Sequence, residues 1–342
     1  MNKKIYALIT IVLLLTGCSN FSTENNILSE KSQPIKKTSL LLDTVVTIQI
    51  YDSQDESILD GAIDIIKKYD LIFSRTNENS ELYKLNHRLL PHDGLSYTIS
   101  DELADILSHG IRYGNLSNGS FDITIAPILS LWDFKSDNPI LPEQSSIDKA
   151  IPLVDYKNII LENNTLTFKN EGIEIDLGGI AKGYIADRIK DYLLEQGVKS
   201  AMINLGGNVL CVGSKSDGTP FNIGIQMPYA DRNVTIAAME ISDMTVVSSG
   251  IYERYVTIED KSYHHILNPD TGYPYESNLI SVSIISPYSV DGDGLSTTAF
   301  ALGLEKGMKL IEGIPDIYGI FITDDYELHY TKGFEETINI IE

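Results

Sequence analysis

The chain has 342 residues and a formal net charge of −22 at pH 7. A surface this acidic repels phosphate backbones and anionic lipid headgroups, so we exclude nucleic acid as a partner and expect no electrostatic binding to a lipid surface. Hydrophobic residues make up 43% of the chain, which is ordinary for a globular protein with one large or two smaller domains.

The first residues predict a targeting signal rather than part of the fold. Lys3 and Lys4 precede an apolar stretch at 5–15, which is shorter than the about 20 residues of a membrane span. The run LTGC at 15–18 then resembles the lipobox of bacterial lipoproteins. We therefore expect a signal peptide at 1–17, a lipidated Cys18, and a protein anchored on the extracytoplasmic side of a bacterial cell membrane.

Residues 18–38 are polar and predict a flexible tether, which leaves 39–342 for the folded domain. With Cys18 lipidated, Cys211 is the one remaining thiol, so an internal disulfide is excluded. Cys211 lies in an apolar run and is expected to pack as a small hydrophobic residue.

The folded part shows helix and strand patterns in a mixed, α+β order. Period-two alternation predicts a strand at 40–51, and apolar spacing predicts helices at 55–73 and, after an N-cap at Ser100, at 101–113. A hairpin is predicted at 158–168 around Asn163-Asn164. Further along, the patterns predict a helix at 184–194, strands at 201–212, 221–226, 234–241, 252–258 and 279–286, helices at 295–302 and 306–311, and two short terminal strands.

The run DLGGIAKGY at 176–184 is a candidate anion site. It leads from an apolar, strand-like stretch at 173–175 through two glycines into the helix at 184–194. Free backbone N–H groups and the positive end of a helix dipole suit a phosphate, and Lys182 adds a positive charge. Glycines between a strand and a helix are also ordinary turn residues, so a plain turn is the alternative.

Asp293, Ser296 and Thr297 are candidate ligands for Mg²⁺. At the start of the predicted helix, the spacing i, i+3 and i+4 places them on one face, and all three offer hard oxygen atoms. Ordinary helix capping by the same residue types is the alternative.

Two adjacent histidines follow the expected strand at 252–258. On an extended backbone, His264 and His265 point to opposite faces, so at most one of them serves a given site. Their spacing is not that of a helical zinc pair. A neutral imidazole beside a bound diphosphate would suit a general base.

Eight runs in the same order resemble the block pattern of the ApbE family of FAD:protein FMN transferases, and together they extend from about residue 40 to about residue 303. The runs are SRTNENSELYKLN (74–86), GSFDITIAPILSLW (119–132), DLGGIAKGYIAD (176–187), INLGGN (203–208), FNIGIQMP (221–228), SGIYERY (249–255), HHILNPDTGYP (264–274) and DGLSTTAFALG (293–303).

The resemblance implies a single two-lobed α+β unit with mixed or antiparallel sheets, flanking helices and a flavin site between the lobes. It also implies that FAD is the substrate and that Mg²⁺ or Mn²⁺ is the cofactor. FMN would be transferred through its phosphate to a threonine or serine hydroxyl of an acceptor protein, and AMP would leave. Flavin-carrying subunits of membrane redox complexes are the implied acceptors.

The resemblance also assigns roles to positions of this chain. His265 is the expected base for the acceptor hydroxyl. Leu42 and Thr76 stand where the family usually has a methionine and an aromatic residue, Ser296 where aspartate is frequent, and Asn268 where aspartate is usual. The implied flavin-contact positions are Leu42, Thr76, Ser120, Phe121, Asp122, Asp176, Lys182 and Leu267, and the implied metal positions are Gly179 through its carbonyl, Asp293, Ser296 and Thr297.

Two other functions fit the same residues. A metal-dependent FAD pyrophosphatase would use water in place of the protein hydroxyl and would release FMN and AMP. A flavin-binding surface lipoprotein would need the flavin contacts but neither metal nor base, and the joint presence of Asp293, Thr297 and His265 argues against it.

Overall fold

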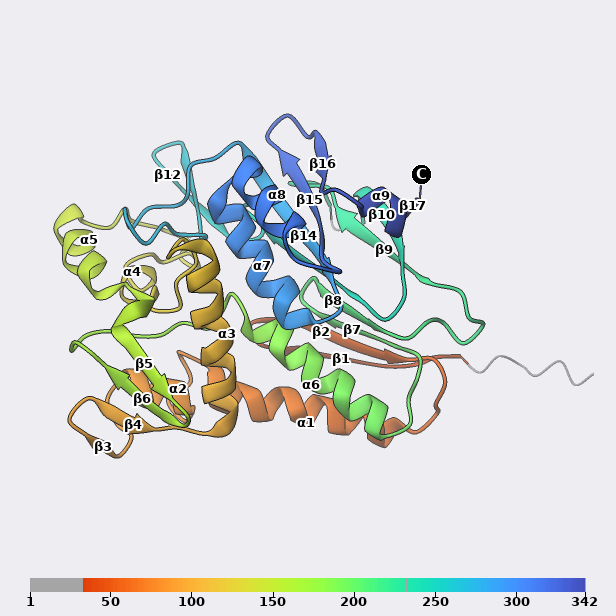
Figure 1. Ribbon diagram of the computed structural model, residues 1–342, viewed down its shortest axis with the longest axis horizontal. Helices are drawn as coiled ribbons and strands as arrows, with labels where there is room; N and C mark the ends of the chain where they lie inside the picture. The colour runs from red at the N-terminus through yellow and green to blue at the C-terminus, as the bar shows by residue number, and fades with distance from the viewer. Residues whose placement is uncertain (1–32, 232, 342) are drawn as a thin grey trace, which may run out of the picture. The chain divides into compact units, whose positions relative to one another are not determined.

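The computed structural model describes residues 33–231 and 233–341, which Figure 1 draws in colour. From Gln33 onward the chain forms one compact unit. The expected signal peptide at 1–17 and the expected lipidation site at Cys18 lie outside the described residues. Within the described ranges, no helix combines the length and the apolar composition that crossing a membrane requires.

An eight-stranded sheet forms the centre of the fold, and all its neighbouring strands are antiparallel. One strand, β14, is buried along its whole length because both faces of the sheet are covered there. The strands in spatial order are β1 (Ile35–Leu41), β2 (Thr44–Ile50), β7 (Ala201–Leu205), β8 (Asn208–Val212), β11 (Thr245–Gly250), β14 (Leu279–Ser286), β15 (Tyr318–Thr323) and β16 (Leu328–Tyr330).

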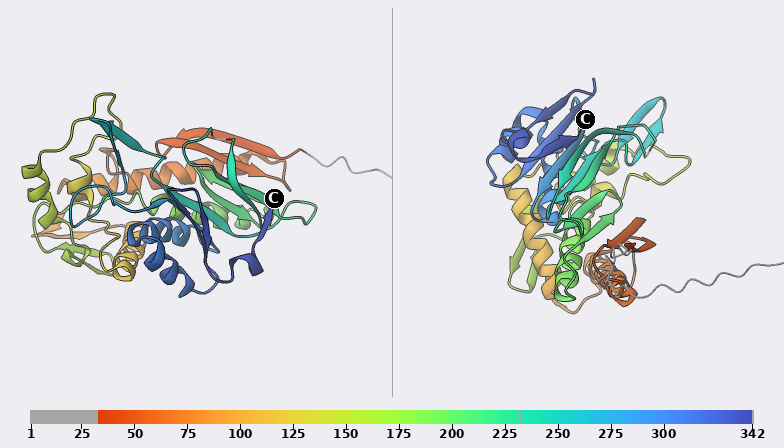
Figure 2. Two further views of the ribbon diagram at one scale, coloured as in Figure 1. Left: turned by 90° about the horizontal axis from the view of Figure 1, so that it is seen from above. Right: turned by 90° about the vertical axis from the view of Figure 1, so that its right-hand side faces the viewer.

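Helices cover one face of this sheet (Figures 1 and 2). The helix α7 (Ser289–Leu302) packs on β11 and β14, while α6 (Ala181–Glu195) packs beside it and contacts β7 and β8. Next to α6 lies α1 (Glu56–Phe73), whose buried residues recur at helical spacing. The other helices near this face are α3 (Asp101–Ser117) and α8 (Leu304–Glu312).

A three-stranded sheet, with β17 (Asn339–Ile341), β10 and β9 in that order, covers the other face. Apolar residues of β9 (Phe221–Gln226) and β10 (Thr235–Ile241) form a core cluster with Ile285 of β14 and Ile320 of β15. Cys211 belongs to this cluster and is fully buried, as predicted. Burial raises the pKa of its thiol to about 12, so the thiol is not a reactive group at neutral pH.

The remaining elements form a smaller part of the fold. A four-stranded sheet, β3-β4-β6-β5, packs its apolar face into the main core, and a separate small core surrounds Trp132. These elements are α2 (Glu81–Asn86), β3 (His92–Asp93), β4 (Ser96–Thr98), α4 (Ala126–Leu129), α5 (Gln144–Ala150), two short 3₁₀ helices (Ile151–Leu153 and Tyr156–Asn158), β5 (Ile159–Glu162), β6 (Thr165–Phe168), β12 (Tyr255–Ile258) and β13 (Lys261–His264). The last helix, α9 (Phe334–Thr337), packs instead beside the three-stranded sheet.

The α+β class with antiparallel sheets and flanking helices is confirmed, and several elements match their predicted ranges. The strands β9 and β14 have the predicted bounds, α1 begins one residue later than predicted, and the hairpin around Asn163-Asn164 is present as β5 and β6. These segments carry regular apolar patterns, so local sequence was sufficient to place them.

Three predicted strands are wrong in their extent. The strand at 40–51 is a hairpin that turns at Leu42-Asp43, where both residues have left-handed φ angles of 54° and 56°. This geometry usually uses Asn-Gly, so Leu-Asp gave no warning of it. The strand at 201–212 turns at Gly206-Gly207, and the strand expected at 252–258 begins at Tyr255. Because β1 begins at Ile35, the last residues of the expected tether at 18–38 belong to the sheet.

Candidate active site

The glycine turn brings α6 directly against α7. A Cβ atom on Gly183 would lie 2.2 Å from the carbonyl oxygen of Ser289 and 2.8 Å from Cβ of Asp293, so only glycine allows this approach. The Gly183 N–H donates a 2.9 Å hydrogen bond to Oδ2 of Asp293. Burial raises the pKa of Asp293, and the nearby Lys182 ammonium counteracts that rise. The first turn of α6 and the middle of α7 therefore share one charged centre.

The glycine turn was expected to offer free backbone N–H groups, but two of these groups already donate hydrogen bonds within the protein. Gly178 N–H donates to Oδ1 of Asp176 at 2.8 Å, and Gly183 N–H donates to Asp293. The chain's own carboxylates thus use the positive end of the α6 dipole. An incoming phosphate would have to be held by Lys182, by other groups or by a cation.

The metal candidates do not lie on a first helical turn, as was predicted. The helix α7 begins at Ser289, and its first two N–H groups donate to Asp187 at 2.7 and 2.9 Å. Asp187 of α6 therefore caps α7, so Asp293 does not cap its own helix, although it accepts an N–H from the first turn of α6. Asp293, Ser296 and Thr297 still share one face of α7, because the i, i+3, i+4 rule holds along the whole helix.

A directed chain of hydroxyl groups links this face to β11. Ser296 Oγ–H donates to the Asp293 carbonyl at 2.9 Å. Ser249 Oγ lies 2.8 Å from Ser296 Oγ and 2.9 Å from Thr297 Oγ1. The arrangement in which each hydroxyl proton has its own acceptor has Ser296 donating to the Asp293 carbonyl, Ser249 donating to Ser296, and Thr297 donating to Ser249. In this arrangement the Thr297 proton points toward Ser249, and the lone pairs of Thr297 Oγ1 are available to a ligand.

This donor set fits a hard cation. Asp293 is 4% exposed and supplies a carboxylate, and no lysine or arginine forms an ion pair with it within the described ranges. Thr297 is half-buried and offers lone pairs, whereas Ser296 is fully buried and accepts from Ser249. A Cβ atom on Gly179 would lie 3.9 Å from Thr297 Oγ1, so the Gly179 backbone borders the same point. Carboxylate, hydroxyl and carbonyl oxygens are ligands that suit Mg²⁺.

Ser249 was not predicted from the sequence. It stands in SGIYERY, one of the runs that resemble the family, but its role depends on β11 lying under α7. A pattern of isolated serines in a strand carries no signal of this kind.

A buried clamp fixes the strand-like stretch that leads into the glycine turn. Asn86 donates from Nδ2 to the Ile175 carbonyl and accepts the Ile175 N–H at Oδ1, both at 2.8 Å. Next along the chain, Asp176 forms an ion pair with Arg75 at 3.0 Å. Asp176 is thus oriented by two neighbouring elements. Neither Asn86 nor Arg75 was predicted as a site residue.

We expect Asn86→Ala to lower the free energy of unfolding by about 2–4 kcal/mol, because it leaves a buried N–H and a buried carbonyl of Ile175 without partners. Urea denaturation of the variant and the wild type measures the difference. Asn79→Ala, which removes an exposed asparagine side chain, is the control and should change stability by less than about 0.5 kcal/mol. Equal stabilities for the two variants would contradict the clamp.

The two histidines differ in what their ring nitrogens contact. His264 uses both, since Nε2 bonds to the Tyr275 carbonyl at 3.0 Å and Nδ1 accepts the Ile266 N–H at 3.3 Å. His265 Nδ1 bonds to the Arg254 carbonyl at 3.0 Å. A carbonyl can only accept, so Nδ1 carries the proton and Nε2 keeps a free lone pair. Burial lowers the pKa of His265 to about 4, which makes the neutral, proton-accepting form dominant at pH 7.

Glu253 is a further charged group of the site that sequence reasoning missed. Its side chain is reached by water, yet the surrounding protein raises the pKa of its carboxyl to about 7, with Lys182 acting against the rise and Asp293 adding to it. The charges of Lys182 and Arg254 also act on His265. Lys182, Glu253, His265 and Asp293 therefore lie in one region, close enough for their charges to act on one another.

Three of the predicted flavin positions, Phe121, Leu42 and Thr76, lie in different parts of the structure near this region. Phe121 lies against the Gly179 backbone, where an added Cβ would be 3.1 Å from its ring. Leu42 is at the β1–β2 turn beside Asp43, whose pKa is lowered by its bond to Lys135 and, less strongly, by Arg254. Thr76 is exposed next to Arg75. Contact of these residues with a flavin stays a prediction.

Three other predicted flavin positions have structural partners within the protein. Asp122 is buried, and its carboxylate accepts hydrogen bonds from both N–H and hydroxyl of Thr124 and from the Tyr156 N–H. The Ser120 carbonyl accepts from the Tyr275 hydroxyl at 2.8 Å. Leu267 packs in the small core around Trp132. These residues hold the loops near the site, and their contact with a flavin also stays a prediction.

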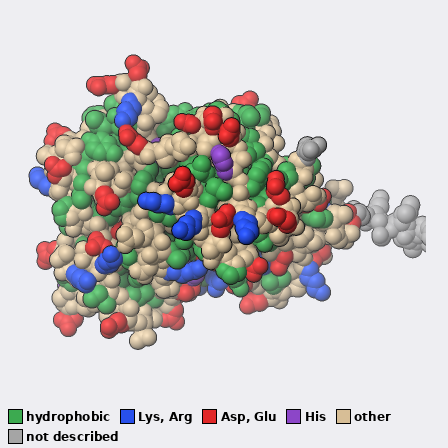
Figure 3. Space-filling model, turned by 45° about the horizontal axis from the view of Figure 1, so that its top comes forward, with side chains coloured by type: hydrophobic (Ala, Val, Ile, Leu, Met, Phe, Trp, Pro, Cys, Tyr) green, Lys and Arg blue, Asp and Glu red, His purple; other side chains and the backbone are tan. Residues whose placement is uncertain are grey.

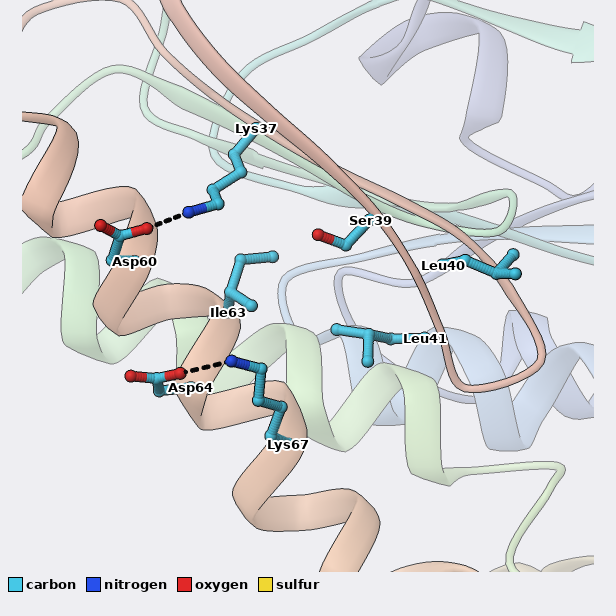
Figure 4. A pocket seen from close by; sticks show the side chains of 8 residues that line it. All are labelled: Lys37, Ser39, Leu40, Leu41, Asp60, Ile63, Asp64 and Lys67. Atoms are coloured by element: carbon cyan, nitrogen blue, oxygen red, sulfur yellow. Dashed lines mark hydrogen bonds and ion pairs between the residues drawn. The ribbon is translucent and has the colours of Figure 1, made fainter.

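A separate hollow of about 630 Å³ lies between β1 and α1 (Figure 4). Its charged side chains form pairs, Lys37 with Asp60 and Lys67 with Asp64. None of the predicted site residues lines it. Because its charged side chains are paired with one another and no candidate base or metal ligand lines it, we assign this hollow no chemical role.

Known proteins resemble this chain over most of its length. The ApbE family matches residues 42–321. A FAD:protein FMN transferase of Klebsiella pneumoniae is 33% identical over 85% of this chain and 90% of its own, and one of Treponema pallidum is 26% identical over 90% and 89%. Among solved structures, the ApbE protein of Thermotoga maritima is 28% identical with a TM-score of 0.80, and covers 89% of this chain and 99% of its own.

Proposed function

This chain belongs to the ApbE family, and we propose that it is a FAD:protein FMN transferase that uses Mg²⁺ and joins FMN to a threonine or serine hydroxyl of an acceptor protein. The observation that carries the proposal is the contact of the first turn of α6 with the Asp293–Thr297 face of α7. It gathers a lysine, a carboxylate and an oriented hydroxyl in the region that also contains His265.

The bonds of the reaction follow from these positions. The acceptor oxygen forms a bond to the FMN phosphorus, the bond between the two phosphates breaks, and AMP leaves. The proton of the acceptor hydroxyl passes to Nε2 of His265, whose lowered pKa keeps that atom unprotonated. Lys182 supplies a positive charge opposite the phosphates.

Asp293, Thr297 and the Gly179 carbonyl would hold the cation. When bound, Mg²⁺ would neutralise charge that develops on the diphosphate. The local residues keep this point available: Ser249 turns the Thr297 proton away, and Asp293 is fixed by the Gly183 N–H. Ser296 is the weakest of the four implied metal positions, because its oxygen already accepts from Ser249.

The function is tested by incubating the full chain with FAD and Mg²⁺, with and without a flavin-carrying redox subunit from the same organism. AMP release and the mass of the subunit are followed. A gain of one FMN on the subunit, lost with EDTA, is expected. AMP and free FMN without a labelled subunit would favour the pyrophosphatase, and bound FAD without AMP would favour a binding protein.

We expect Ser249→Ala to weaken Mg²⁺ binding about three- to tenfold, since it removes the acceptor that orients the Thr297 hydroxyl. Isothermal titration of Mg²⁺ measures this directly. Ser248→Ala is the matched control, because Ser248 is the neighbouring residue of β11 and its hydroxyl bonds to Ser283 instead. Equal Mg²⁺ affinities in the two variants would contradict the role of Ser249.

We also propose that the protein is anchored in the membrane through lipidated Cys18, on the extracytoplasmic side. The LTGC run at 15–18 and the preceding apolar stretch support this. A Cys18→Ala variant should fail to incorporate a labelled fatty acid and should leave the membrane fraction. If the Cys18→Ala variant still incorporated the labelled fatty acid, or stayed in the membrane fraction, the proposed anchor at Cys18 would be wrong.

A further inference from the structure

Exposed tyrosines gather beside the candidate active site. The Tyr229 ring lies 5.9 Å from the ring of Tyr252 and 6.1 Å from that of Tyr255. Tyr326, in the turn between β15 and β16, is close enough for its charge to act on Tyr229. Tyr229, Tyr255 and Tyr326 are 55%, 44% and 42% exposed. We call these four residues the tyrosine surface.

Two members of this surface have unfavourable backbone conformations. Tyr229 and Tyr326 have φ angles of 60° and 65°, a left-handed region in which a bulky side chain is a clear outlier. Such conformations typically cost about 1 kcal/mol or more and concentrate at binding sites. Asparagine or glycine would relieve the strain, so the fold alone does not call for tyrosine at either position.

One part of the tyrosine surface is next in the chain to residues of the candidate active site. Tyr252 is followed by Glu253 and Arg254, and the Arg254 carbonyl holds His265 at 3.0 Å. Tyr255 is the cross-strand partner of His264. The tyrosine surface therefore adjoins the candidate active site through Glu253 and Arg254, the two residues that separate Tyr252 from Tyr255.

The rim of the tyrosine surface is acidic around Tyr326. Asp324, Asp325 and Glu327 are exposed on both sides of Tyr326, in a chain whose net charge is −22. Figure 3 shows that acidic side chains are also spread widely over the face it presents, between apolar and basic ones. Carboxylates around exposed aromatic rings complement a partner segment that carries lysine or arginine beside apolar residues.

We propose that the tyrosine surface is the docking site for the acceptor protein and receives a basic segment next to the hydroxyl that takes up FMN. The proposal rests on the transferase function proposed above and adds the recognition of its partner. Tyrosine rings suit this role, because they offer a large amphipathic contact area with little conformational freedom to lose.

The test compares the full chain with the double variant Tyr229→Ala/Tyr326→Ala, using as probe a redox subunit that the wild type labels with FMN. We expect the KM for the subunit to rise at least about tenfold, with a similar loss of affinity when subunit binding is measured without FAD. The KM for the subunit should also rise with salt in the wild type, and less steeply in a Asp325→Asn/Glu327→Gln variant.

Tyr288→Ala is the matched control, because Tyr288 is 64% exposed at the start of α7 and lies outside the tyrosine surface. It should leave the KM unchanged. An unchanged KM and subunit affinity in the double variant would overturn the docking site while FMN transfer itself persists. A wild type that binds FAD but labels no subunit would instead overturn the transferase function, and with it this proposal. Thermal melting of each variant separates these results from loss of folding.

Discussion

Asp293→Asn is expected to lower the rate of FMN transfer by roughly 10²–10³-fold and to abolish measurable Mg²⁺ binding. The substitution removes the negative charge of the proposed cation site. A bound cation stabilises the charge of a transition state by several kcal/mol, and each loss of about 1.4 kcal/mol lowers the rate tenfold. The asparagine oxygen can still accept the Gly183 N–H, so the contact between α6 and α7 is retained. AMP release against Mg²⁺ concentration, together with isothermal titration, measures both effects.

Asp291→Asn is the control for this prediction. Asp291 is on the same helix, but its carboxylate accepts from Arg112 and Tyr113, away from Thr297. Its replacement should leave Mg²⁺ binding unchanged and should lower stability by no more than about 1–2 kcal/mol. If the Asp293→Asn variant transferred FMN at the wild-type rate in Mg²⁺, the assignment of Asp293 as a metal ligand would be wrong, whatever the control shows.

His265→Asn should reduce FMN transfer by about 10²–10⁴-fold while Mg²⁺ affinity is maintained. The asparagine amide can replace Nδ1 as the donor to the Arg254 carbonyl, but it offers no counterpart of Nε2. His264→Gln is the matched control, since its amide can replace Nε2 as the donor to the Tyr275 carbonyl. It should lower stability and keep the transfer rate within a few-fold. Equal rates in the two variants would contradict the assignment of the base.

The same residue gives a prediction for the pH dependence of the rate. Burial lowers the pKa of His265 from its ordinary value of 6.5 to about 4. The imidazole is therefore already unprotonated, and able to act as a base, once the pH exceeds about 4. We expect the acidic limb of the kcat profile to lie near pH 4, and the rate to be nearly constant from about pH 5 to 6.5. An acidic limb at pH 6–7 that is lost in His265→Asn would show a base with an unshifted pKa.

Much of the site could be predicted because its residues stand in recognisable local runs. The glycine turn, Lys182, His265 and the spacing of Asp293, Ser296 and Thr297 are visible in the order of residues alone. The structure brings Lys182, Asp293 and His265 to one region, and it favours Thr297 over Ser296 as an oxygen ligand. The residues that orient these groups, such as Ser249 and Asn86, carry no local pattern.

The beginning of α7 shows why local reading fails where burial is complete. The helix is buried on nearly all sides, so it lacks the apolar stripe that marks a surface helix. Its early residues include Gly292 and Gly294, which favour a turn when read locally. Contact with β11, β14 and α6 overrides that preference. The residues that were predicted to form the first turn of a helix, with the metal candidates among them, therefore lie in the middle of α7.

The sequence by itself determined the α+β class, the regular elements α1, β9 and β14, and the types of chemical group in the site. Those features follow from periodicity and residue type within a few turns of chain. The tertiary structure alone decided that Asn86 clamps Ile175, that Ser249 contacts Thr297, and that Tyr229 and Tyr326, from two separate turns, come close enough for their charges to interact. Such pairings depend on which strands and helices become neighbours, and the energy of a contact between distant segments leaves no periodic trace in the order of residues.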